Sequence, residues 1–178
     1  EPIIQAMASP GRVIRRSVDP GVPGPFGVEV TRYRLPSRTV LDLPEPVEML
    51  GQVVAPLGAT GPRPLVLLLH GRHETCYRPA TGRLSVAWPC PDGTKAVPSY
   101  RGYTYLQRHL ASRGFVTVSV SANGINAQDI TDDGGTAARS ALVRHHLRLW
   151  SEWTASGGAW EGRVDMQQVM LLGHSRGG

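Results

Sequence analysis

The chain has 178 residues, of which 40% are hydrophobic and 19% are charged, which fits one globular domain and excludes a disordered chain. The net charge of +5 comes from scattered arginines without a basic run, so it disfavours a nucleic-acid-binding protein. No stretch approaches the roughly 18 apolar residues that cross a bilayer, which disfavours a transmembrane segment.

The chain begins at Glu1 without a signal sequence, so we expect a processed form or an excerpt. Residues 1–26 are rich in proline and glycine and predict an irregular N-terminal arm. Residues 27–36 (GVEVTRYRLP) alternate apolar and polar side chains as a half-buried strand does, and residues 49–56 (MLGQVVAP) predict a second strand. The unbroken apolar run LVLLL at 65–69 is typical of a strand buried in a parallel sheet.

Residues 72–102 lack periodicity and predict a long loop, which in a compact domain is usually functional. We predict that Cys76 and Cys90, both in this loop, form a disulfide, which would stabilise the fold by about 3 kcal/mol through chain entropy. A disulfide favours a secreted or extracytoplasmic protein; free thiols in the cytoplasm are the alternative. The loop's aromatic residues either line an acyl or aromatic pocket or form a small satellite core: Tyr77, Trp88, Tyr100 and Tyr103.

Periodicity predicts a helix over 103–114, a buried strand over 115–120 (FVTVSV) and a polar connection over 123–135. Residues 135–158 predict a second amphipathic helix, and VMLL at 169–172 predicts the last buried strand. The apolar face of the second helix comprises Leu142, Val143, Leu147, Trp150 and Trp153. Because helices and strands alternate, the order predicts an α/β fold with parallel crossovers in its second half.

Residues 173–177 (GHSRG) match the pattern G-x-S-x-G directly after the last predicted strand. This pattern suits a sharp turn from a strand into a helix, in which a Cβ atom two residues before or after the serine would clash. Such a turn pushes the serine hydroxyl clear of the sheet, so Ser175 is a candidate nucleophile.

The turn that follows 65–69 supplies a second candidate element, His70-Gly71-Arg72. Acyl transfer needs two N–H donors aimed at the developing oxyanion, each worth about 3–4 kcal/mol. We expect one donor to be the backbone amide of Arg176, which follows the nucleophile, and the other to be the amide of Arg72, with Gly71 as the neighbouring alternative. In this interpretation the two arginine side chains need not take part in the chemistry.

LVLLLHG, the helix before FVTVSV, and VMLLGHSRGG together resemble the N-terminal half of an α/β-hydrolase-fold serine hydrolase, closest to bacterial esterases, lipases and cutinase-like enzymes, over residues 27–178. The resemblance implies an incomplete, mostly parallel sheet, an acyl-enzyme on Ser175, oxyanion donors at Arg72 and Arg176, a small or polymeric ester substrate, and no cofactor or metal. The family places its acid and histidine after the nucleophile, so we expect both beyond residue 178. The segment alone should then be inactive and expose apolar surface along its last strand.

Other histidines and acids are weaker candidates. His109, His145 and His146 lie on predicted helices as surface or boundary residues, while His70 and His174 are expected to shape the site. The acids Asp129, Asp132 and Asp133 are expected as polar loop residues, and Asp165 as a residue that caps or turns the chain before the last strand.

Four other functions compete with hydrolysis. His70-x-x-His73-Glu74 lacks a third placed ligand for zinc, and no phosphate-binding glycine motif is present. A non-catalytic hydrolase-like binding or scaffold domain stays open as an alternative. An acyltransferase with the same nucleophile also stays open, because it would share every residue named above.

Overall fold

The computed structural model describes residues 19–178. The predicted arm over 1–26 therefore falls mostly outside the described residues, and residues 19–27 run as turns and bends before the first strand. Among the helices of residues 19–178, none is long and apolar enough to cross a membrane.

Five strands form one sheet in the order β1-β2-β7-β3-β8. Their bounds are Val28–Arg38 (β1), Val47–Pro56 (β2), Arg63–Leu69 (β3), Val116–Val120 (β7) and Val164–Gly173 (β8). β2 is antiparallel to β1 and to β7, whereas β3 is parallel to both β7 and β8. The predicted α/β class and the parallel second half are confirmed, but the sheet is mixed rather than mostly parallel.

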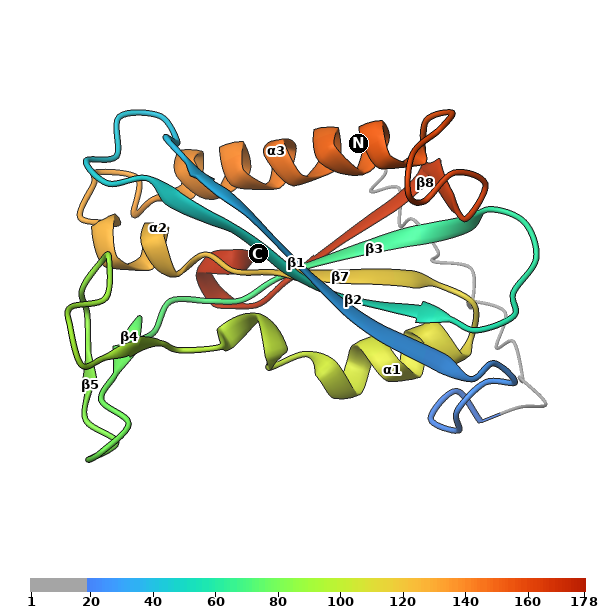
Figure 1. The fold of residues 1–178 in the computed structure, drawn as a ribbon, viewed down its shortest axis with the longest axis horizontal. Coiled ribbons are helices and arrows are strands. Elements are labelled where there is room, and N and C mark those ends of the chain that lie inside the picture. The colour runs from blue at the N-terminus through green and yellow to red at the C-terminus, as the bar shows by residue number, and fades with distance from the viewer. Residues whose placement is uncertain (1–18) are drawn as a thin grey trace, which may run out of the picture.

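Two long helices cover opposite faces of this sheet (Figure 1): α1 is Thr104–Ser112 and α3 is Thr136–Thr154. On the α3 face, Leu142 and Trp150 are fully buried against alternate residues of the strands. His146 lies one helical turn from each of them and is also fully buried, with its Nδ1 atom 2.7 Å from the Tyr33 hydroxyl. The prediction of a surface or boundary position for His146 is therefore wrong.

The α1 face holds a buried polar cluster. The Gln52 amide donates to the Thr104 hydroxyl and to the Gln107 side chain, at 2.7 and 3.2 Å. The Gln107 amide returns a hydrogen bond of 2.9 Å to the Gln52 carbonyl, and the Thr117 hydroxyl donates to the Val54 carbonyl at 3.0 Å. Because each amide finds partners, these side chains can be buried without leaving polar groups unsatisfied.

The predicted polar connection over 123–135 contains a short helix, α2, at Asn123–Gln128. Its first residues follow β7 and are buried against β2. There the Glu48 carboxylate of β2 accepts the N–H groups of Asn123 and Gly124 at 2.7 and 3.0 Å. Burial raises the pKa of Glu48. A carboxylate at a helix N-terminus satisfies amides that have no partner within the helix, which a polarity pattern does not register.

Strand β8 is longer than predicted and lies at an edge of the sheet in the described residues, where it pairs with β3 alone. Val169, Met170 and Leu171 are exposed, so the prediction of a buried last strand is wrong for the described residues. The exposure agrees with the expected apolar surface along the last strand. Asp165 lies within β8, where it accepts hydrogen bonds from Gln167 and Gln168 beside an irregularity in the pairing.

The 72–102 segment carries a small sheet in the order β5-β4-β6 and a single 3-10 turn. Its elements are Cys76–Tyr77 (β4), Leu84–Ser85 (β5), Lys95–Ala96 (β6) and Ser99–Arg101 (η1). The predicted disulfide between Cys76 and Cys90 is present, with a Cα–Cα distance of 5.7 Å. It closes the segment around β4 and is compatible with an oxidising compartment.

Candidate functional site

The candidate site lies where the parallel strands end. β3, β7 and β8 run in the same direction, and their carboxyl ends point toward α2 and the β4–β5 region (Figure 1). Each strand leads directly into a segment of interest: β3 into His70-Gly71-Arg72, β7 into α2, and β8 into the 3-10 turn η2 at Ser175–Gly177. In open α/β sheets, this edge is where ligands usually bind.

Ser175 stands in the left-handed backbone region, with a φ of +55°. The glycines on either side leave no room for a side chain. A Cβ on Gly173 would lie 2.6 Å from the Gly178 Cα and closer still to the Gly177 carbonyl group. A Cβ on Gly177 would lie 2.7 Å from the His70 carbonyl oxygen and closer still to that of Leu69. Both glycines are therefore required by this turn, as the G-x-S-x-G pattern predicts.

The turn after β3 lies against Ser175. A Cβ on Gly71 would come within 3.0 Å of the Ser175 Cβ and of the His174 carbonyl oxygen. The two motifs that the sequence places about a hundred residues apart therefore lie side by side at the carboxyl edge. Gly71 is itself buried, so this close approach depends on the absence of a side chain there.

The backbone amides of Arg72 and Arg176 flank this contact. In residues 19–178, neither amide donates to a backbone or side-chain acceptor, whereas the neighbouring amides of Gly177 and Gly178 donate to the carbonyl groups of His174 and Ser175. Both residues are exposed. Two backbone N–H groups are thus available at the two positions predicted for oxyanion donors.

His70 is a fixed, neutral part of the same turn. Its Nε2 atom accepts the Ala122 N–H at 2.9 Å, so the proton lies on Nδ1, which donates to the Gly71 carbonyl oxygen at 2.9 Å. Burial lowers the pKa of His70 to about 4. The His73 ring packs beside it, with its Nε2 atom 3.1 Å from the His70 Nδ1. His70 therefore shapes the site and has no free nitrogen with which to act as a base.

The side chains of Arg72 and Arg176 meet at Asp129, which directly follows α2. Asp129 is buried and accepts hydrogen bonds from both arginines and from Arg139 of α3. Burial alone would raise the pKa of Asp129, but the three arginines outweigh it and lower that pKa. The expectation of Asp129 as a loop residue missed this role, and no local sequence signal could have revealed contacts across 47 and 57 residues.

Among the remaining predicted acids and histidines of residues 19–178, His174 lies at the site, against Gly71, and the others do not join it. Asp133 accepts the N–H groups of Gly135 and Ala137 at the start of α3, and Asp132 is exposed. His174 is exposed beside Ser175, while His109 and His145 are half-buried on α1 and α3. Among the described residues, no histidine is hydrogen-bonded to the Ser175 hydroxyl.

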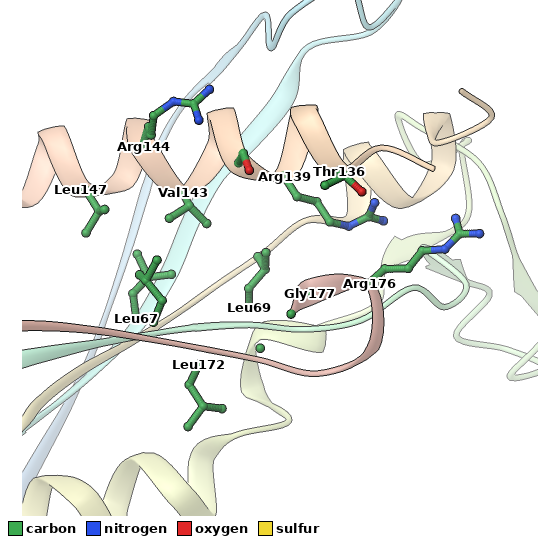
Figure 2. A pocket seen from close by; sticks show the side chains of 14 residues that line it. Leu67, Leu69, Thr136, Arg139, Val143, Arg144, Leu147, Leu172, Arg176 and Gly177 are labelled. Carbon is green, nitrogen blue, oxygen red and sulfur yellow. The ribbon is translucent and has the colours of Figure 1, made fainter. Parts of the chain in front are cut away.

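Two cavities adjoin this edge. The larger, of about 350 Å³, lies between α3 and β8 behind the turn, and Ser175 does not line it (Figure 2). Its walls are largely apolar and come from Leu67, Leu69, Val143, Leu147 and Leu172.

The smaller cavity, of about 220 Å³, lies beneath the disulfide segment. Three of the four aromatic residues predicted to line a pocket do so here, namely Tyr77, Trp88 and Tyr100, whereas the Tyr103 hydroxyl donates to the Leu69 carbonyl at 3.4 Å.

No protein-family model matches the chain, and no curated protein matches it either.

Proposed function

We propose that this chain is the N-terminal part of an α/β-hydrolase-fold serine hydrolase, which acts on carboxylic esters or related acyl substrates. The observation that carries the proposal is the backbone of Ser175. A serine with a φ of +55° stands between two glycines that cannot carry a Cβ, directly after a parallel strand. Strained backbone of this kind persists where the surrounding structure requires it, and it concentrates at functional sites.

The chemistry assigned to the site is acyl transfer through a covalent intermediate. The Ser175 hydroxyl oxygen attacks the substrate carbonyl carbon while a histidine removes the hydroxyl proton, and the carbonyl oxygen becomes an oxyanion. The N–H groups of Arg72 and Arg176, which have no acceptor in residues 19–178, donate to that oxyanion. The C–O bond then breaks, the alcohol leaves with the proton held by the histidine, and water releases the acyl group by the reverse sequence.

We propose that the histidine and the acid that orients it lie beyond residue 178. His70 and His146 are the buried histidines of the described residues. His70 uses both of its nitrogens within the turn, and His146 contacts Tyr33 in the core beneath α3. Neither can serve as the base for Ser175. The disulfide between Cys76 and Cys90 also supports the proposal of a secreted or extracytoplasmic enzyme.

Labelling of the full-length protein with a fluorophosphonate probe tests this proposal, because the probe reacts with activated serines. We expect labelling of the wild type, no labelling of Ser175→Ala, and wild-type labelling of Ser151→Ala, a control on the exposed face of α3. Ester hydrolysis should follow the same pattern. A folded wild-type protein that takes no label would overturn the nucleophile and favour the non-catalytic binding domain.

A further inference from the structure

One buried carboxylate joins three arginines from separate segments at the carboxyl edge. The Asp129 Oδ1 atom accepts the Arg72 Nε–H at 2.9 Å, and its Oδ2 atom accepts the Arg176 Nη1–H at 2.6 Å and the Arg139 Nη2–H at 3.0 Å. Figure 2 shows the guanidinium groups of Arg139 and Arg176 extending in the same direction, away from the apolar walls of the larger cavity. Asp129 thereby ties the turn after β3 to the turn after β8.

Burial separates the roles of the three arginines. The side chains of Asp129 and Arg139 are 1% and 4% exposed, so this pair compensates two charges within the fold. The side chains of Arg72 and Arg176 are 41% and 46% exposed, so these two arginines reach Asp129 from the solvent side of the edge. Because Arg139 already balances the charge of Asp129, the second and third arginine are not needed to neutralise it.

The peptide between Gly71 and Arg72 is fixed from its other side as well. The Gly71 carbonyl oxygen accepts hydrogen bonds from His70 Nδ1 at 2.9 Å and from the Asn126 side chain at 3.1 Å. In a trans peptide the C=O and N–H groups point in opposite directions, so holding the carbonyl in the interior directs the Arg72 N–H outward. Arg139 also donates to the Asn126 side chain, at 2.7 Å, which links this anchor to Asp129.

We propose that Asp129 is a positioning residue that holds the Arg72 and Arg176 backbone amides together as the two donors of the oxyanion hole. The inference rests on the proposed function, since it assigns those amides to the same reaction. Oxyanion donors act only when they are aimed at the place where charge develops in the transition state. The two turns follow different strands, and one carboxylate that binds both arginine side chains keeps their amides at a constant spacing.

The signature of such a residue is a loss in kcat rather than in substrate binding, because the oxyanion forms only in the transition state. Removal of a whole oxyanion donor costs about 100- to 1,000-fold in kcat. Misplacement of two donors that remain present should cost about 10- to 100-fold, with KM changed less than about twofold.

The double variant Arg72→Gln/Arg176→Gln is the sharpest test. It removes both exposed arms of the cluster, keeps both backbone amides, and leaves the buried pair of Asp129 and Arg139 intact. The charge-matched control is Arg108→Gln/Arg148→Gln, two exposed arginines on α1 and α3 that make no side-chain hydrogen bond in the described residues.

We expect the Arg72→Gln/Arg176→Gln variant of the full-length enzyme to lose about 10- to 100-fold in kcat and in fluorophosphonate labelling rate, with a smaller fall in melting temperature than Asp129→Asn causes. The control variant should match the wild type. If the double variant keeps the wild-type kcat and labelling rate, the positioning role is wrong even though the nucleophile stands. If the wild type itself takes no label, the proposed function fails instead.

A double-mutant cycle with Asp129→Asn provides a second measurement. Adding Arg72→Gln/Arg176→Gln to Asp129→Asn should reduce kcat by less than about twofold, because the three side chains act as one unit. Losses in kcat that multiply independently would overturn the inference. Asp129→Asn leaves Arg139 without its buried counter-charge, so its kcat is expressed per folded molecule from its melting curve.

Discussion

The core beneath α3 and the carboxyl edge of the same sheet are built on opposite principles. The core gathers apolar side chains around Leu142 and Trp150 and gains its stability from their burial. The carboxyl edge holds a serine with positive φ, glycines that admit no Cβ, and a buried carboxylate among arginines. One face of the sheet thus carries stability and, on the proposed function, one end carries the chemistry, so substitutions should separate the two.

Trp150→Ala in the core is expected to separate stability from the reactivity of Ser175 most strongly. Trp150 is fully buried, and truncation of a buried tryptophan costs about 3–5 kcal/mol of unfolding free energy. Chemical denaturation of the full-length protein measures this loss, while the labelling rate of Ser175 per folded molecule should stay unchanged. Trp160→Ala, at a half-buried residue that packs on Trp150, is the control and should cost less. Equal losses for the two variants would contradict the placement of the core.

The reverse effect is expected from Gly177→Ala at the edge. The added Cβ would meet the carbonyl oxygens of Leu69 and His70, which are backbone atoms and cannot move aside as a flexible side chain can. We expect the labelling rate of Ser175 to fall at least about 100-fold, or about 2.7 kcal/mol, because the nucleophile is displaced. Gly27→Ala, where the new Cβ would make ordinary contacts with Leu57, should label normally. Normal labelling of Gly177→Ala would refute the required turn.

The smallest effect concerns pH and the buried histidines. Burial lowers the pKa of His146 to about 3 and that of His70 to about 4, from an ordinary value of 6.5. The unfolded chain therefore binds more protons below about pH 6.5, and the free energy of unfolding falls as the pH falls, by up to about 1.4 kcal/mol per pH unit for each histidine.

His146→Leu isolates the core histidine in this measurement. Urea denaturation at about pH 7 and about pH 5 should give the variant a smaller loss of stability on acidification than the wild type has. Glu48, whose pKa is raised by burial, acts in the opposite direction, but it is present in both proteins and cancels in the comparison. Equal losses in the two proteins would mean that His146 is not held neutral in the core.

Much of the fold could be predicted because its strongest signals are local. Three segments carry their pattern within a short stretch of sequence. LVLLL forms β3, FVTVSV forms β7, and the long amphipathic helix is α3. The glycines around Ser175 were also predictable, because the clash that they avoid involves the turn itself and the neighbouring strand end. A local signal also indicates the burial of His146, which lies four residues from both Leu142 and Trp150 on the buried face of α3.

The rest depends on contacts between distant segments. α2 is polar in sequence, and its burial follows from Glu48, a residue 75 positions away from Asn123. The arginines on Asp129 likewise come from turns that only the sheet brings together. From sequence alone, a run of polar residues predicts a loop. Its burial becomes possible only when the folded sheet brings partners to its hydrogen-bonding groups.

The left-handed backbone of Ser175 sets stability against activity at a single position. A φ of +55° disfavours every residue with a side chain, and glycine would adopt it without strain. Among variants selected for thermal resistance alone, this position should drift toward glycine and lose its hydroxyl. On the proposed function, serine at this position keeps the nucleophile in a backbone conformation that glycine would adopt without strain.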